Sequence, residues 1–209
     1  MNIASTQRRT GLLILCALPV LAAPSVTHGA TIYFGPVNAP IPFTFDGLYL
    51  NPYTGATAAT QPADWNTAPW INPFFGGVDI GSDALLRPII TGADQVVNMA
   101  FGAVIDASGN FAAGESGSTT HVGPAANQFQ LGTPGYIGFT FKPLSGGATY
   151  YGWAQIRISN TGPGAIIDWA YEDAPGTAIP AGSTVPEPGS ALLLGLGAAA
   201  WAARRRRFQ

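Results

Sequence analysis

The chain has 209 residues, of which 47% are hydrophobic, so it is long enough to bury a core. Charge is uneven: residues 31–184 hold three basic and ten acidic residues, a net charge of −7. An acidic segment without a basic stripe excludes the usual nucleic-acid binders, which must neutralise phosphates. This segment has no cysteine and one histidine, which excludes a zinc site or a cysteine nucleophile, and we expect no cofactor.

The first thirty residues have the pattern of an export signal. Arg8 and Arg9 precede an apolar run over residues 11–23, and small or polar residues follow. This order predicts a helical signal peptide over residues 1–30, read by the secretion translocon. The paired arginines also fit twin-arginine export, which stays the alternative, because Gly11 stands where that signal has a bulky residue.

Residues 31–184 predict one β-rich domain, since Gly and Pro recur and β-branched or aromatic runs lie between them. About nine strands predict an all-β fold, namely an antiparallel β-sandwich, of which the jelly roll is one form. A closed barrel is the main alternative. The expected strands are 32–34, 43–51, 74–80, 85–90, 96–99, 101–106, 136–142, 149–159 and 165–172.

The last three of these strands have the clearest alternation. Ile137, Phe139 and Phe141 share one face, which we expect to be core. Ser145-Gly146-Gly147 predicts a turn that makes an antiparallel hairpin of strands 136–142 and 149–159. On strand 165–172 we expect one side to carry Ile167, Trp169 and Tyr171.

Flat aromatic rings predict where a sugar could bind, because apolar ring faces stack on sugar rings. Tyr53, Trp65 and Trp70 are the candidate glycan-binding residues, and the two tryptophans lie in an open, loop-like stretch. Trp153 and Trp169 lie in strong strands, and we expect both in the core.

Metal binding and catalysis have weaker support. Asp79 and Asp83 flank a glycine-containing bend and are weak calcium candidates, although an ordinary turn explains them as well. His121 is expected to be an exposed loop histidine, and there is no Gly-x-Ser-x-Gly motif. Glu115 and the pair Glu172-Asp173 could serve a glycosidase, but ten acidic residues make such pairs unspecific. We therefore expect no enzymatic activity.

Residues 185–209 form a three-part tail. Two prolines flank Glu187, a 15-residue apolar run follows over 189–203, and four arginines come next. The run would span about 22 Å as a helix, less than the roughly 30 Å of a bilayer core, which predicts a short transmembrane helix that is held only transiently. Arginines stay on the cytoplasmic side. The residues expected to direct processing and sorting are Val185, Pro186, Glu187, Pro188, Arg204, Arg205, Arg206 and Arg207.

This tail resembles the PEP-CTERM sorting signal of Gram-negative bacteria that make exopolysaccharide. The resemblance implies recognition and cleavage by exosortase, a membrane protease-like enzyme. Blocks 46–51, 135–139, 151–157 and 168–172 are similar to those of many uncharacterised ectodomains with the same tail, which implies shared architecture and no particular activity.

Together these patterns predict a precursor anchored in the inner membrane and then delivered to the cell surface or outside. We expect a structural or adhesive protein of the envelope or of an exopolysaccharide matrix, as in a biofilm. A carbohydrate-binding module is the alternative, and a glycan-active hydrolase is the less favoured one.

Overall fold

A computed structural model describes residues 29–91, 95–112 and 121–184. The expected signal helix and the expected transmembrane helix lie outside the described residues. Within them the chain is all-β, with antiparallel strand pairing and one short 3₁₀ helix, η1 (Phe75–Gly77). The strands are β1 (Thr31–Phe34), β2 (Ala39–Ile41), β3 (Tyr49–Leu50), β4 (Thr57–Ala58), β5 (Ile71–Phe74), β6 (Asp79–Ser82), β7 (Leu86–Pro88), β8 (Asn98–Met99), β9 (Val104–Ile105), β10 (Pro134–Phe141), β11 (Tyr150–Arg157), β12 (Gly164–Glu172) and β13 (Ile179–Pro180).

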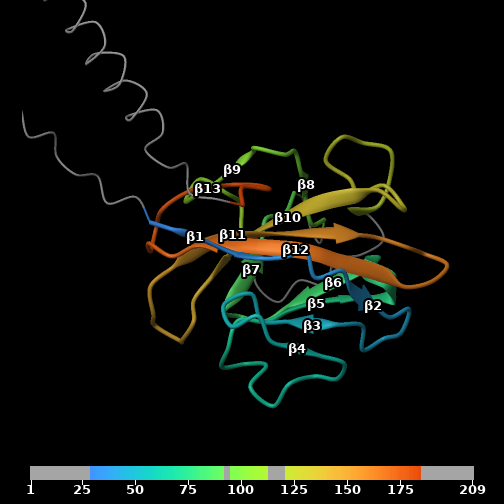
Figure 1. Cartoon of the computed structure of the whole chain (residues 1–209), viewed down its shortest axis with the longest axis horizontal. Helices are drawn as coiled ribbons and strands as arrows, with labels where there is room; N and C mark the ends of the chain where they lie inside the picture. Colours follow the sequence, from blue (N-terminus) through green and yellow to red (C-terminus); the bar gives the residue numbers. More distant parts are fainter. Residues whose placement is uncertain (1–28, 92–94, 113–120, 185–209) are drawn as a thin grey trace, which may run out of the picture.

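The strands form three layers (Figure 1). A seven-stranded sheet in the order β1-β12-β11-β10-β7, with β2 beside β12 and β8 beside β10, lies in the middle. The sheet β4-β3-β5-β6 lies on one side of it, and the pair β13-β9 lies on the other. This layering is consistent with the expected sandwich, to which β9 and β13 add a partial third layer.

The long hairpin of β10 and β11 is confirmed, with Phe141 opposite Tyr150 next to the predicted turn. Ile137, Phe139 and Phe141 lie in the larger core cluster, between the middle sheet and β3–β6. The opposite face of the hairpin is covered as well, because Trp153 packs in a second cluster with β9 and β13. Trp153 and Trp169 are both buried, as expected.

Strand β12 departs from the predicted alternation at one residue. Gln155 pairs with Asp168, but Ile156 pairs with Ile166, so one extra residue is inserted between them. A bulge of this kind reverses the alternation beyond it. Ile166 therefore joins Trp169 and Tyr171 in the core, and the prediction that Ile167 does so is wrong.

The expected strand 74–80 is a hairpin instead. β5 ends at Phe74, η1 turns the chain, and β6 returns antiparallel from Asp79. Gly76 and Gly77 have φ of 69° and 88°, a left-handed conformation that glycine adopts without a Cβ clash. The two glycines make the turn that the aromatic run concealed.

The expected strand 43–51 is mostly a bent loop, and only β3 forms at its end. Gly47 has φ of 57° and its Cα lies against the backbone of Pro73 and Phe74, so the chain turns there. Phe43 and Phe45 remain exposed. β1 covers its expected range and starts one residue earlier, whereas β7, β8 and β9 form within their expected ranges but are shorter. β2 and β4 were not expected.

Candidate functional site

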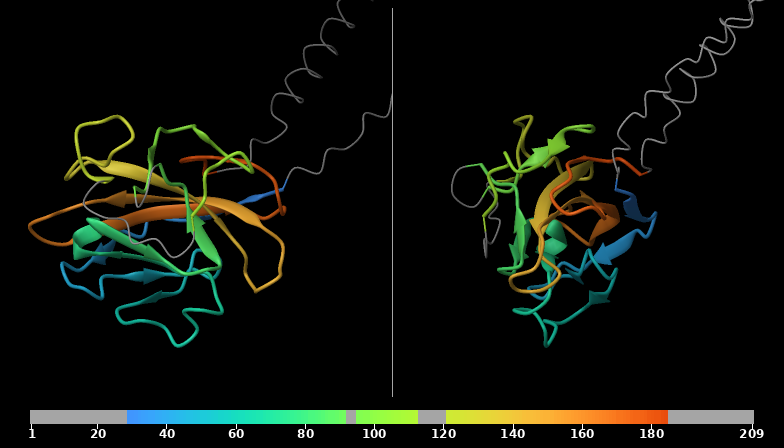
Figure 2. Two further views of the ribbon diagram at one scale, coloured as in Figure 1. Left: turned by 180° about the vertical axis from the view of Figure 1, so that it is seen from behind. Right: turned by 90° about the vertical axis from the view of Figure 1, so that its left-hand side faces the viewer.

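The two ends of the described domain lie on the same side of the molecule (Figure 2). Near one end the backbone N–H of Ala30 donates to the carboxylate of Asp173. At the other end β13 pairs with β9. The last described residue is Thr184, and the residue before it, Ser183, donates its backbone N–H to the carbonyl of Pro180. All eight residues expected to direct sorting lie beyond Thr184, outside the described residues.

The three candidate glycan-binding rings are not alike in exposure. Trp70 is only 5% exposed, contrary to the expected open loop, and its indole N–H donates to Asp64 over 3.1 Å. Trp65 is half-buried, with its ring 5.2 Å from and perpendicular to that of Tyr49. Tyr53 is 41% exposed and lies 6.1 Å from the ring of Phe141. Only Tyr53 presents a ring broadly to solvent.

The two weak calcium candidates lie at opposite ends of a strand, not on a bend. Asp79 opens β6 and Asp83 follows it, four residues or about 13 Å away in extended chain. The Asp83 carboxylate accepts the N–H groups of Leu85 and Leu86 over 2.8 and 2.7 Å. In the described parts of the chain no group of three or more His, Cys, Asp or Glu residues converges.

Asp83 and His121 are buried titratable groups. Burial raises the pKa of Asp83 to about 6, although its hydrogen bonds to the backbone oppose this. His121 is fully buried, so the prediction of an exposed loop histidine is wrong. Its backbone carbonyl accepts the N–H of Phe129 over 2.7 Å, which fixes it in the fold. Burial lowers the pKa of His121 to about 4, and the nearby backbone carbonyls of Gly77 and Val78 act in the opposite direction. Neither ring nitrogen of His121 has good hydrogen-bond geometry with these carbonyls.

The candidate carboxylates Glu172 and Asp173 lie close together, because a Cβ built on Gly29 would meet a carboxylate oxygen of each. Glu172 is buried at the end of β12, whereas Asp173 accepts the Ala30 N–H. Glu115 lies outside the described residues. A different carboxylate, Asp168, accepts a hydrogen bond of 2.8 Å from the hydroxyl of Tyr33, and burial together with this bond raises the pKa of Tyr33 to about 12. That pair connects β1 to β12 and stabilises the edge of the middle sheet.

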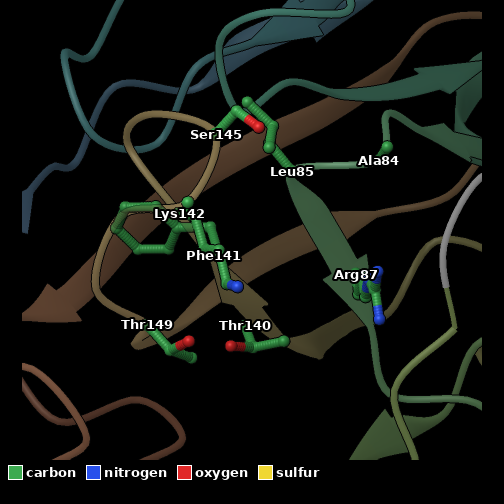
Figure 3. A pocket seen from close by; sticks show the side chains of 9 residues that line it. Ala84, Leu85, Arg87, Thr140, Phe141, Lys142, Ser145 and Thr149 are labelled. Carbon is green, nitrogen blue, oxygen red and sulfur yellow. The ribbon is translucent and has the colours of Figure 1, made fainter.

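Sequence reasoning missed a cavity of about 480 Å³ between β7, β10 and the loop that joins β10 to β11 (Figure 3). Arg87 and Lys142 both line it, together with the side chains of Thr140 and Thr149. No sequence motif marks this cavity. The only available indication was the scarcity of basic residues, because these two are among only three between residues 31 and 184.

Sequence reasoning also missed a group of phenylalanine rings at the surface, which we call the phenylalanine cluster: Phe43, Phe45, Phe74 and Phe75. The ring of Phe45 lies 5.8 Å from that of Phe74 and 6.2 Å from that of Phe75, and Phe43 lies 6.0 Å from Phe75. Phe45 is 76% exposed. The cluster exists because the η1 turn carries Phe74 and Phe75 to the loop that was expected to be a strand.

A protein-family model described as the PEP-CTERM protein-sorting motif matches residues 184–207. The match confirms the resemblance of the tail and includes all eight residues expected to direct sorting, whose individual roles stay predictions. No curated protein and no solved structure matches the chain. Within residues 29–91, 95–112 and 121–184 no helix has the length and hydropathy of a membrane span.

The motif defines the class of protein. The chain is an exported protein that exosortase sorts, made as a membrane-anchored precursor, and a β-rich domain directly precedes the motif.

Proposed function

We propose that the protein is a non-enzymatic structural or adhesive component of the extracellular matrix or envelope. The observation that carries this proposal is the phenylalanine cluster on a domain whose next residues are a sorting motif. Clustered exposed apolar rings usually mark a surface that contacts another molecule. An exported domain with such a surface can attach to the material into which it is delivered.

The energetic argument rests on Phe45. Burying a phenylalanine side chain is worth about 1.5–3 kcal/mol, so one ring can change retention by roughly tenfold or more. Its neighbours Phe74 and Phe75 are half-buried and hold the exposed ring against the turn of the β5–β6 hairpin. A preorganised ring loses little side-chain entropy on contact.

A carbohydrate-binding module is the second candidate. It is favoured by Tyr53, the most exposed of the three candidate rings, and by the hydroxyl-lined cavity. A glycan-active hydrolase stays an untested alternative.

The test is the replacement Phe45→Ser. We expect roughly tenfold less of the exported protein in the matrix fraction and correspondingly more free in the medium. The matched control is Phe101→Ser, because Phe101 is 75% exposed and lies outside the cluster, next to Tyr136. Unchanged retention of the Phe45 variant, or an equal loss in the control, would contradict an adhesive role for the cluster.

A further inference from the structure

We propose that the cavity lined by Arg87 and Lys142 binds the carboxylate of an acidic sugar unit. This site is separate from the phenylalanine cluster and does not depend on the adhesive role proposed above. The geometry that carries the proposal is the meeting of two cations and several hydroxyl groups in one cavity of an acidic domain.

Strand pairing brings the two cations together. Arg87 lies on β7 directly opposite Thr140 on β10, and the backbone N–H of Lys142 donates to the carbonyl of Leu85 over 2.9 Å. One cation therefore lies on β7 and the other directly after the adjacent strand β10, and both line the same space (Figure 3).

The charge distribution of the domain leaves Arg87 and Lys142 available to bind an anion. Eight of the ten acidic residues between 31 and 184 lie in the described parts of the chain, and none of these eight forms an ion pair with Arg87 or Lys142, both of which are exposed. Two like charges that share a cavity repel each other, and an anion placed between them relieves that repulsion. The third basic residue, Arg157, lies at the far end of β11 and does not line the cavity.

The chemistry of the lining selects a carboxylate on a sugar. An arginine fork matches the two oxygens of a planar carboxylate, and a lysine adds a compact positive charge. Thr140 donates its hydroxyl to the carbonyl of Tyr150 over 3.0 Å, which leaves the oxygen lone pairs free to accept from a ligand. Thr149 and Ser145 add two more hydroxyls, and Leu85 gives an apolar wall. Such a lining suits sugar hydroxyls beside an acid group.

The dimensions agree with this ligand class. The volume of about 480 Å³ falls within the roughly 300–1,000 Å³ typical of small-molecule sites. The cations are exposed, so we expect modest affinity that falls as ionic strength rises.

The test uses titration calorimetry to measure the affinity of galacturonate and glucuronate oligomers for the full chain in detergent micelles. We expect at least one oligomer to bind, and its methyl ester, which lacks the charge, to bind roughly tenfold more weakly. Arg87→Ala and Lys142→Ala should each weaken binding by a similar factor. Arg157→Ala is the matched control and should bind like the wild type. Unfolding temperatures of all variants should agree, because the three side chains are exposed.

Three results would overturn the proposal. The first is no binding of either oligomer. The second is equal binding of the oligomer and its ester, or an equal loss with Arg157→Ala, which would show that the two cations do not read the carboxylate. The third is equally tight binding of acetate, which would make the cavity a plain anion site and remove the sugar from the assignment.

Discussion

Two buried side chains, Asp83 and His121, have opposite effects on how stability depends on pH. The folded-state pKa of Asp83 is raised to about 6 by burial, so its contribution is present below about pH 4 and is lost as pH rises to about 6. The folded-state pKa of His121 is lowered to about 4, so its contribution is present above about pH 6.5 and is lost as pH falls. In the wild type the two contributions oppose each other over the same interval.

The replacement Asp83→Asn removes the contribution of this buried acid. Relative to the wild type, we expect the free energy of unfolding of this variant to rise by up to about 3 kcal/mol between pH 4 and pH 7, because the wild type must ionise a buried acid and the variant does not. Urea unfolding at a series of pH values measures it. A difference between the two proteins that does not change with pH would show that Asp83 keeps an ordinary pKa.

The replacement His121→Leu should have the opposite pH dependence. The ring packs perpendicular to Phe129 at 5.9 Å, a site that accepts an apolar side chain. We expect the variant to gain up to about 3 kcal/mol relative to the wild type as pH falls from 6.5 to 4. The same unfolding series tests this, and a relative loss on acidification would contradict the assignment.

The burial of a single residue could be predicted where the residue belongs to a long alternating strand, and not elsewhere. Trp153 and Trp169 were assigned to the core because each belongs to a long alternating strand. Trp70 and His121 are buried, but neither lies in such a strand, and their hydrogen bonds to Asp64 and Phe129 leave no alternating pattern in the sequence. Arg87 and Lys142 meet because β7 pairs with β10, a register that the sequence does not encode locally.

At the scale of elements, the long strands were predictable and the short ones were not. β10, β11 and β12 have eight or nine residues each, enough for alternation to appear. β3, β4 and β13 have two residues each, too few for any period, and tertiary pairing alone defines them. The β5–β6 hairpin was hidden because the aromatic residues before Gly76 and Gly77 and the β-branched residues after them look like one strand.

The β5–β6 turn should be intolerant of a side chain at Gly76. A Cβ there would lie 2.2 Å from the carbonyl oxygen of Ser159, and φ is 69°. We expect Gly76→Ala to lower the free energy of unfolding by more than about 3 kcal/mol, through left-handed strain plus a backbone clash.

The matched control for this variant is Gly102→Ala. Gly102 also has positive φ, 79°, but nothing lies within 4 Å of a Cβ built on it. It should lose only the left-handed strain of about 1–2 kcal/mol. Equal losses in the two alanine variants, measured by urea unfolding, would rule out the clash at the turn.

At the scale of the whole molecule, the position of the two domain ends determines how the precursor meets the membrane. Four residues separate Thr184 from the start of the apolar run at Gly189, a reach of at most about 18 Å. The end of the domain near Ala30 lies on the same side. We therefore expect this side to face the membrane in the precursor, with the phenylalanine cluster and the cavity carried by other parts of the domain.

The sorting motif gives a prediction at this scale. Replacing Pro186 and Pro188 with alanine, or deleting Arg204–Arg207, should leave an unprocessed form in the membrane, because exosortase loses either its recognition segment or the cytoplasmic arginines that position the tail. Fractionation followed by immunoblotting measures it. Release at the normal size from either variant would contradict the roles expected of these residues.

The most direct test of the central claim, that exosortase processes an exported β-rich domain, is intact-mass analysis of the protein recovered outside the cytoplasm. We predict a mass well below the 21.6 kDa of the full chain, with the N-terminus near Ala30 and the tail beyond the Pro186-Glu187-Pro188 segment removed. Recovery of the intact 209-residue chain from the cytoplasm, with none of it outside, would contradict the account.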